Sequence, residues 1–186
     1  MLALFYRAGC GRSSLVAAVR CTKIRGVKPV IGKQDAAGLR IALVASRYND
    51  MVTTRLIAGA RAALKQHGAA EEDVFEFSVP GAWELPLAAK ALVTSGRFDA
   101  IVCLGCVIRG ETTHHQHVGG EAIRGLAQLS LETGLPIGLG VLTTENLEQA
   151  LARAGGKAGD KGAEAVMAAV EMANLLRDIR AQGQKR

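Results

Sequence analysis

Aromatic residues, prolines and cysteines are scarce in this chain of 186 residues. Phe, Trp and Tyr together make up 4% of it, and there are four prolines and four cysteines. The neighbouring cysteines Cys103 and Cys106 lie in an apolar run, and nothing supplies the second half of a zinc site. A C-x-x-C spacing also suits a redox pair, but we favour two small core residues in a reducing cytosol. No segment has the roughly 18 continuous apolar residues of a membrane span.

Apolar residues and glycines, by contrast, are plentiful. Hydrophobic residues make up 49% of the chain and there are 22 glycines, which suits one tightly packed α/β domain. The net charge of +6 belongs to the N-terminus: residues 1–33 contain seven basic residues and no acid, and the remainder carries 16 basic and 17 acidic side chains. The folded part is therefore not expected to bind nucleic acid.

The chain is predicted to have three parts: a disordered basic extension at residues 1–37, a folded domain at residues 38–181 and a C-terminal tail at residues 182–186. An acid-free segment with arginines also fits an organelle transit peptide. A disordered extension or an upstream start codon accounts for it as well, and we favour these two over targeting. The protein is accordingly expected in the cytoplasm.

Apolar runs alternate with helical patterns from residue 39 onward. The patterns predict strands at 39–45, 74–79, 100–108 and 136–142, and helices at 51–67, 83–94, 119–133, 145–153 (with Thr144 as cap) and 162–179. This alternation with short connections predicts a four-stranded parallel sheet with helices on both faces. Ligands bind such sheets outside the carboxyl ends of the strands, so the loops after the strands are the candidate site.

The loop after the third strand, residues 105–118, is the richest in polar groups. Gly110 permits a sharp turn, and Thr112 and Thr113 lie just before a helix, where free N–H groups bind anions. A phosphate site is therefore predicted at residues 110–113. The glycine spacing resembles a P-loop superficially, but Glu111 stands where a P-loop needs lysine, which argues against ATP binding.

Three of the four histidines follow in the same loop: His114, His115 and His117. They could be solvated imidazoles at a polar helix start. They could bind a metal, although adjacent His114 and His115 cannot easily face one point, and we expect no metal. One of them could also serve as a general acid or base, because an unperturbed imidazole titrates near neutral pH.

Three other segments carry candidate groups. Trp83 and Glu84 begin a helix, where they could be a core residue and a partner of the helix dipole, or could bind sugar hydroxyls. Tyr48 could be a surface aromatic or stack on a planar ring. The glycine-rich segment 153–162, with Arg153 at its start, could be a solvated connection or a flexible cationic loop for an anion.

Five segments in this order and spacing resemble the lumazine synthase family over about residues 39–179. They are S-R-Y-N, V-P-G-A-W-E-L-P, G-C-V-I-R-G-E-T-T-H, G-V-L-T-T-E-N-L-E-Q-A and R-A-G-G-K-A-G-D-K-G. The resemblance implies a flavodoxin-like three-layer fold that assembles as pentamers with active sites between subunits. It also implies a condensation of 5-amino-6-(D-ribitylamino)uracil with 3,4-dihydroxy-2-butanone 4-phosphate, without a cofactor, to give 6,7-dimethyl-8-ribityllumazine.

The resemblance assigns a role to each motif residue. His114 corresponds to the acid/base residue, and Tyr48 to the aromatic that stacks on the pyrimidine. The residues that match the ribityl segment are Ala82, Trp83 and Glu84, and those that match the uracil contacts are Cys106, Val107 and Ile108. The residues that match the phosphate site are Glu111, Thr112 and Arg153, with Lys161 adding charge, and Leu139 matches a residue that closes the neighbouring subunit's pocket.

This chain departs from the family pattern at a few positions. His115 and Gln116 stand where an aromatic residue and Asp are frequent, Asp160 where Asn is usual, and Leu139 where Phe is frequent. Alternative interpretations are a riboflavin synthase of the same fold, a shell protein without turnover, and a flavin- or phosphate-binding module. Expected partners are copies of the chain, as a pentamer or an icosahedral shell, and riboflavin synthase.

Overall fold

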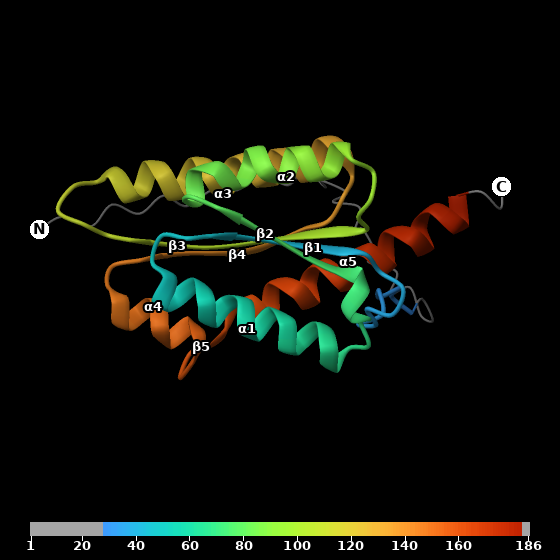
Figure 1. The fold of residues 1–186 in the computed structure, drawn as a ribbon. Helices are drawn as coiled ribbons and strands as arrows, with labels where there is room; N and C mark the ends of the chain where they lie inside the picture. Colours follow the sequence, from blue (N-terminus) through green and yellow to red (C-terminus); the bar gives the residue numbers. More distant parts are fainter. Residues whose placement is uncertain (1–27, 184–186) are drawn as a thin grey trace, which may run out of the picture.

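A four-stranded parallel sheet lies between two layers of helices in the computed structural model, which describes residues 28–183 (Figure 1). The strands are β1 (Ile41–Ser46), β2 (Val74–Val79), β3 (Ala100–Ile108) and β4 (Ile137–Thr144), and they lie in the order β2-β1-β3-β4. All three neighbouring pairs are parallel. The predicted fold class is confirmed.

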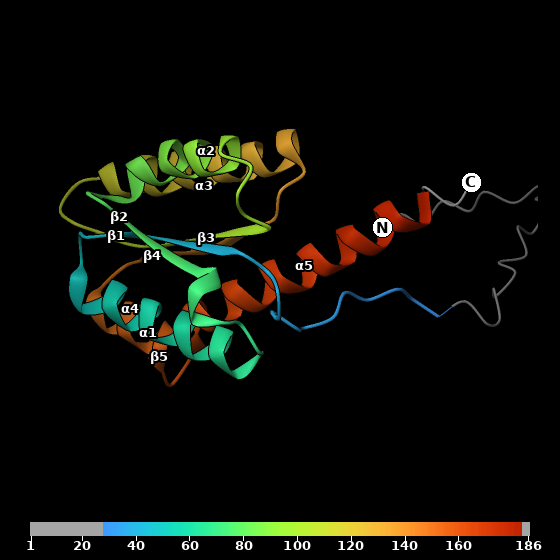
Figure 2. The ribbon, with the colours of Figure 1, turned by 45° about the vertical axis from the view of Figure 1, so that its right-hand side comes forward.

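The helices divide between the two faces of the sheet. On one face lie α1 (Asp50–Gln66), α4 (Leu147–Arg153) and α5 (Lys161–Gly183), and on the other α2 (Leu85–Thr94) and α3 (His114–Thr133), as Figures 1 and 2 show. Short 3-10 helices span Glu71–Asp73 and Ala82–Glu84. Because the chain runs from β1 outward to β2 and then back past β1 to β3, the direction of winding reverses between β1 and β3.

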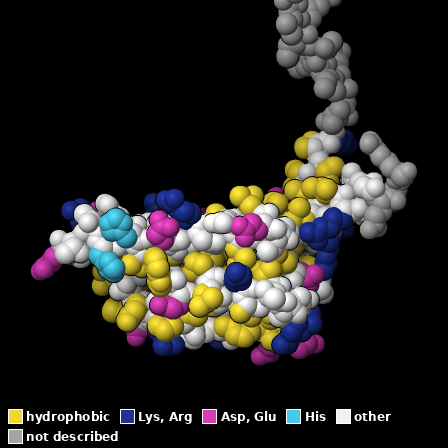
Figure 3. All heavy atoms as spheres, turned by 90° about the horizontal axis from the view of Figure 1, so that it is seen from above, with side chains coloured by type: hydrophobic (Ala, Val, Ile, Leu, Met, Phe, Trp, Pro, Cys, Tyr) yellow, Lys and Arg dark blue, Asp and Glu magenta, His cyan; other side chains and the backbone are white. Residues whose placement is uncertain are grey.

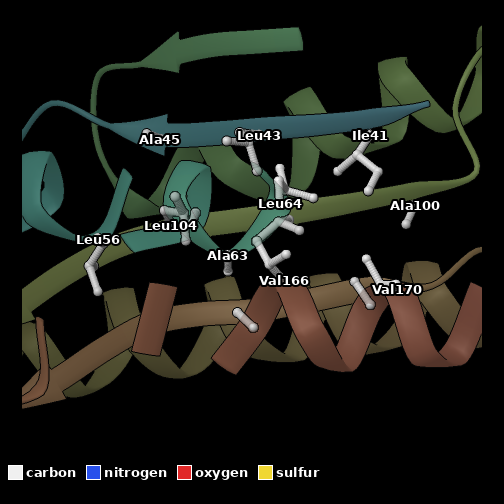
Figure 4. Close-up of a cluster of buried hydrophobic side chains, with 14 of the residues drawn as sticks. Ile41, Leu43, Ala45, Leu56, Ala63, Leu64, Ala100, Leu104, Val166 and Val170 are labelled. Carbon is white, nitrogen blue, oxygen red and sulfur yellow. The ribbon is translucent and has the colours of Figure 1, made fainter. Parts of the chain in front are cut away.

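The central strands are buried on both faces, as their continuous apolar sequences predict. The cluster between the sheet and the α1/α5 layer contains Leu43, Leu64 and Val166, which meet in Figure 4. The second cluster, under α2 and α3, contains Val44 and Ile101. Two opposed layers of side chains therefore hold the sheet rigidly, which fixes where its carboxyl end lies.

Two predicted helix starts are wrong. Helix α3 begins at His114, five residues before the predicted start, because its first turn is polar and shows no apolar periodicity. Helix α4 begins at Leu147 and its cap is Asn146, whose side chain accepts a hydrogen bond from the Gln149 N–H at 2.9 Å. Thr144, the predicted cap, is the last residue of β4.

The glycine-rich segment before the last helix is a small hairpin rather than a flexible loop. Its strands are β5 (Ala154–Gly156) and β6 (Gly159–Asp160). The Asp160 carboxylate accepts hydrogen bonds from the N–H groups of Gly162 and Ala163 at the start of α5. Asp160 stands where the family usually has Asn, and it still caps the start of the helix.

The end of the predicted N-terminal extension packs against the domain. The Asn174 side-chain amide on α5 donates hydrogen bonds to the carbonyls of Lys33 and Asp35, both at 2.8 Å. At Gly32 an added Cβ would lie 2.0 Å from the Glu171 carbonyl oxygen. Residues 32–35 thus pack against α5, while residues 1–27 and 184–186 lie outside the described part, and the domain boundary at residue 37 stays a prediction. Within that part, no helix is long and apolar enough to cross a membrane.

Candidate functional site

A cleft of about 740 Å³ lies at the carboxyl ends of β1, β2 and β3. This is the point where the winding of the sheet reverses, the usual ligand position in open α/β sheets. Its lining comes from three loops and the first turns of α3: Tyr48, Asn49, Gly81, Ala82, Trp83, Glu84, Cys106, Val107, Ile108, Gly110, Thr112, His114, His115, His117 and Val118. Histidine side chains gather at this end of the molecule (Figure 3).

The structure brings most of the predicted site residues together in this cleft and leaves three outside it. Glu111 is exposed beside the cleft. Leu139 lies on β4 and lines a second hollow of about 600 Å³ between α3 and α5. Arg153 is exposed at the end of α4. The last two lie on β4 and α4, outside the lining of the cleft.

The loop after β1 is tied to the loop after β2. The N–H groups of Arg47 and Tyr48 donate hydrogen bonds to the carbonyl of Pro80. The Tyr48 ring lies against Gly81, where an added Cβ would be 2.8 Å from its Cδ2 atom. Glycine is therefore required for this close approach, and Tyr48, which is 70% exposed, borders the cleft together with Gly81.

Glu84 shapes the second loop. Its Oε2 atom accepts a hydrogen bond from the Gly81 N–H at 2.8 Å, which closes the turn before α2. One carboxylate oxygen is used in this way, and the other is without a hydrogen-bonding partner among the described residues. Trp83 beside it is 60% exposed, so it is not the core residue that one interpretation expected.

Three histidines in the first turn of α3 line the cleft, and they differ in their hydrogen bonding. His114 and His117 are three positions apart, so they lie on neighbouring positions of one helix face. Neither side chain forms a hydrogen bond with a residue that the structure describes. His115 differs, because its Nδ1 atom lies 3.2 Å from the Thr112 carbonyl oxygen. In residues 28–183 no group of three or more His, Cys, Asp or Glu side chains could hold a metal ion.

The two cysteines of β3 are free and buried. They belong to different core clusters, on opposite faces of the sheet, which rules out a disulfide between them. Burial raises the pKa of Cys103 to about 12 and that of Cys106 to about 11. Both are therefore neutral core thiols at physiological pH, as expected.

Asn49 is a cleft residue to which the sequence analysis gave no role. Its backbone is left-handed, with φ 58° and ψ 49°, and its Nδ2 atom donates a hydrogen bond to the Cys106 carbonyl at 2.9 Å. Asn tolerates this conformation better than most residues, but the sequence does not show which distant carbonyl it reaches.

The chain is similar to a family model and to curated proteins. The family model described as 6,7-dimethyl-8-ribityllumazine synthase matches residues 38–177. A curated protein named 6,7-dimethyl-8-ribityllumazine synthase, from Chlorobium chlorochromatii (strain CaD3), is 50% identical over 153 residues, which cover 82% of this chain and 99% of the relative.

Proposed function

Because the chain belongs to the 6,7-dimethyl-8-ribityllumazine synthase family, we propose that the cleft at the carboxyl ends of β1, β2 and β3 is its active site. The family reaction joins the amino group of a ribitylaminouracil to the ketone of a four-carbon sugar phosphate, eliminates phosphate and closes a second ring. It is a transferase step of riboflavin biosynthesis. The observation that carries this assignment is the convergence of Tyr48, Glu84 and His114 from three separate loops.

The pyrimidine would lie against the exposed face of Tyr48. An aromatic ring offers a planar heterocycle a stacking surface, and Gly81 lies in close contact with this ring. The free oxygen of Glu84, next to Trp83 and Ala82, would accept hydrogen bonds from the ribityl hydroxyls. Cys106, Val107 and Ile108 also line the cleft and would contact the uracil.

The phosphate would bind at the start of α3. The first N–H groups of a helix have no partner within it and carry a partial positive charge. Gly110 and Thr112 border the cleft directly before this helix, with Glu111 between them. Backbone amides of Glu111 and Thr112 would hold the phosphate of the second substrate, and its departure during elimination would begin from this site.

His114 would move protons at the reacting carbons. Imine formation needs a proton to remove the ketone oxygen as water, and elimination of phosphate needs a base at the adjacent carbon. His114 is the residue nearest in sequence to the phosphate turn whose imidazole borders the cleft and has no hydrogen-bonding partner among the described residues. It is therefore free to take up and return a proton.

We also propose a pentamer in which neighbouring copies share each site. Leu139 on the edge strand β4 is 47% exposed, and Leu131 and Met172 beside the second hollow are exposed as well. Exposed apolar side chains that adjoin a groove mark interfaces. A neighbouring copy would supply Leu139, which would cover the pyrimidine. It would also supply Arg153, with Lys161 nearby, which would neutralise the phosphate. Light scattering that found an active single chain would contradict this arrangement.

Three finer proposals follow from the family. The compact hairpin Ala154–Asp160 favours a closed icosahedral shell of pentamers, which the mass from light scattering would distinguish from a single pentamer. Riboflavin synthase is the proposed partner, and the two proteins would then elute together. The free thiols fit a reducing cytoplasm, which cell fractionation would test.

The direct test is to mix the purified protein with both substrates and follow the absorbance of the lumazine product. No product above the spontaneous rate would overturn the proposal. Analysis of the product would also separate this activity from a riboflavin synthase, which would consume two lumazines instead of forming one.

A further inference from the structure

The side chain of Asn49 does not do what its position at a helix start would suggest. Asparagine at an N-cap normally accepts a hydrogen bond from the second or third helical N–H. Here the Asn49 side chain makes no capping bond. The backbone carbonyl of Asn49 accepts from the Val52 N–H, and the Asp50 carboxylate accepts from the Met51 N–H. The amide is therefore available for a partner outside α1.

That partner is the Cys106 carbonyl, 57 residues further along the chain. Strands β1 and β3 are paired from Ile41 and Ala100 up to Ala45 and Leu104, where the pairing ends. Cys106 is the next residue of β3 whose backbone N–H and carbonyl point toward β1, since these groups point to alternate sides along a strand. The Asn49 amide thus takes the place of the missing neighbouring strand at two residues that line the cleft.

This contact leaves a defined backbone edge for a ligand. The Arg109 N–H donates to the Thr144 carbonyl on β4, so odd-numbered residues here face β4. The N–H and carbonyl of Ile108 therefore point toward the cleft. Ile108 lies two residues beyond Cys106, whose carbonyl accepts the hydrogen bond from Asn49. We propose that Asn49 is a positioning residue: it holds the end of β3 against β1 so that the Ile108 edge can pair with the donor and acceptor groups of the pyrimidine. This inference rests on the proposed function.

Two substitutions separate the amide from the backbone. Asn49→Gly allows the left-handed backbone but removes the hydrogen bond, and the KM for the pyrimidine should rise about three- to tenfold. Asn49→Asp keeps the shape but turns a carboxylate toward the Cys106 carbonyl, and the same KM should rise about 10- to 100-fold. The KM for the sugar phosphate should stay within twofold in both variants.

A pH series provides a second readout that a purely structural role would not change. In the Asn49→Asp variant the protonated carboxyl group can donate to the Cys106 carbonyl, whereas the carboxylate cannot, and a carbonyl oxygen nearby favours the protonated form. The ratio of pyrimidine KM values, Asn49→Asp over wild type, should therefore fall several-fold between pH 8 and pH 5. The Asn49→Gly ratio should not change with pH.

Asn174→Asp is the matched control. Asn174 also donates its amide to backbone carbonyls, at the other end of the sheet, so this change should lower the melting temperature and leave both KM values unchanged. Normal pyrimidine KM in folded Asn49→Gly and Asn49→Asp would overturn the inference, as would equal rises for both substrates. An inactive wild-type protein would instead overturn the proposed function, and this inference with it.

Discussion

The two ends of the parallel sheet use polar side chains in opposite ways. At the amino end these groups pair with one another: Asp99 accepts hydrogen bonds from the Arg40 N–H and from Arg177. At the carboxyl end the imidazoles of His114 and His117 border the cleft and form no hydrogen bond with a described residue. Polar groups that are satisfied inside the fold stabilise it, whereas groups left without partners are available to a ligand.

The loops at the carboxyl end are nevertheless well anchored. Their contacts run through the backbone and through small polar groups, such as the Gly81 N–H with Glu84 and the Asn49 amide with Cys106. The atoms that anchor these loops are therefore different from the atoms that remain available to a ligand. This division predicts that substitutions at the carboxyl end change kinetics more than stability, and that substitutions at the amino end do the reverse.

The largest effect should come from His114→Ala. Loss of a general acid or base typically lowers turnover about 100- to 10,000-fold, and the low end applies if the amine and ketone also condense without the enzyme. Single-turnover kinetics at saturating substrates would measure the loss, and the melting temperature should not change. An unaltered kcat would show that the imidazole has no part in proton transfer.

Arg153→Ala should act on one substrate. Removal of a charged hydrogen-bond donor to phosphate should raise the KM for the sugar phosphate about 10- to 100-fold, with the KM for the pyrimidine nearly intact. Mixed pentamers of His114→Ala and Arg153→Ala chains should regain part of the activity, because some interfaces then combine two intact halves. No recovery in demonstrably mixed pentamers would place both residues in one chain's site.

Stability should fall in alkaline solution because of the two buried thiols. Their pKa values in the folded state, about 12 for Cys103 and about 11 for Cys106, lie above that of an exposed thiol. The unfolded chain therefore loses these protons first, so the stabilisation is complete below roughly pH 8.5 and is lost as pH rises toward the folded values. Urea unfolding at pH 8 and pH 9.5 should differ by about 2 kcal/mol in unfolding free energy, and by less after Cys103→Ala.

Asp99→Ala should affect the opposite end of the sheet. It leaves the Arg40 N–H without its partner and breaks the ion pair with Arg177. The unfolding free energy should drop by about 1 to 3 kcal/mol, as urea unfolding would show, with kcat and both KM values preserved. A kinetic defect in the folded variant would contradict the division between the two ends.

Gly81→Ala should give the smallest effect and the most local one. The φ of −140° suits alanine, but its Cβ would meet the Tyr48 ring at 2.8 Å, so the ring must shift. The KM for the pyrimidine should rise about three- to tenfold if stacking is partly lost. If Gly81→Ala combined with Tyr48→Ala has the same KM as Tyr48→Ala alone, the effect passes through the ring.

Local patterns in the sequence determined the layered fold, because apolar runs of strand length and amphipathic helices can bury their surfaces in few ways. They also identified the loops of the site, since chemistry in parallel sheets gathers at the carboxyl ends of the strands. Polar stretches carried no such signal: the start of α3 at His114 and the hairpin Ala154–Asp160 follow from packing and backbone pairing between segments. Only the tertiary structure could decide that Asn49 binds Cys106, because a hydrogen bond across 57 residues depends on which strands become neighbours. The resemblance already implied that Leu139 serves a neighbouring subunit, and the structure leaves Leu139 and Arg153 outside the lining of the chain's own cleft.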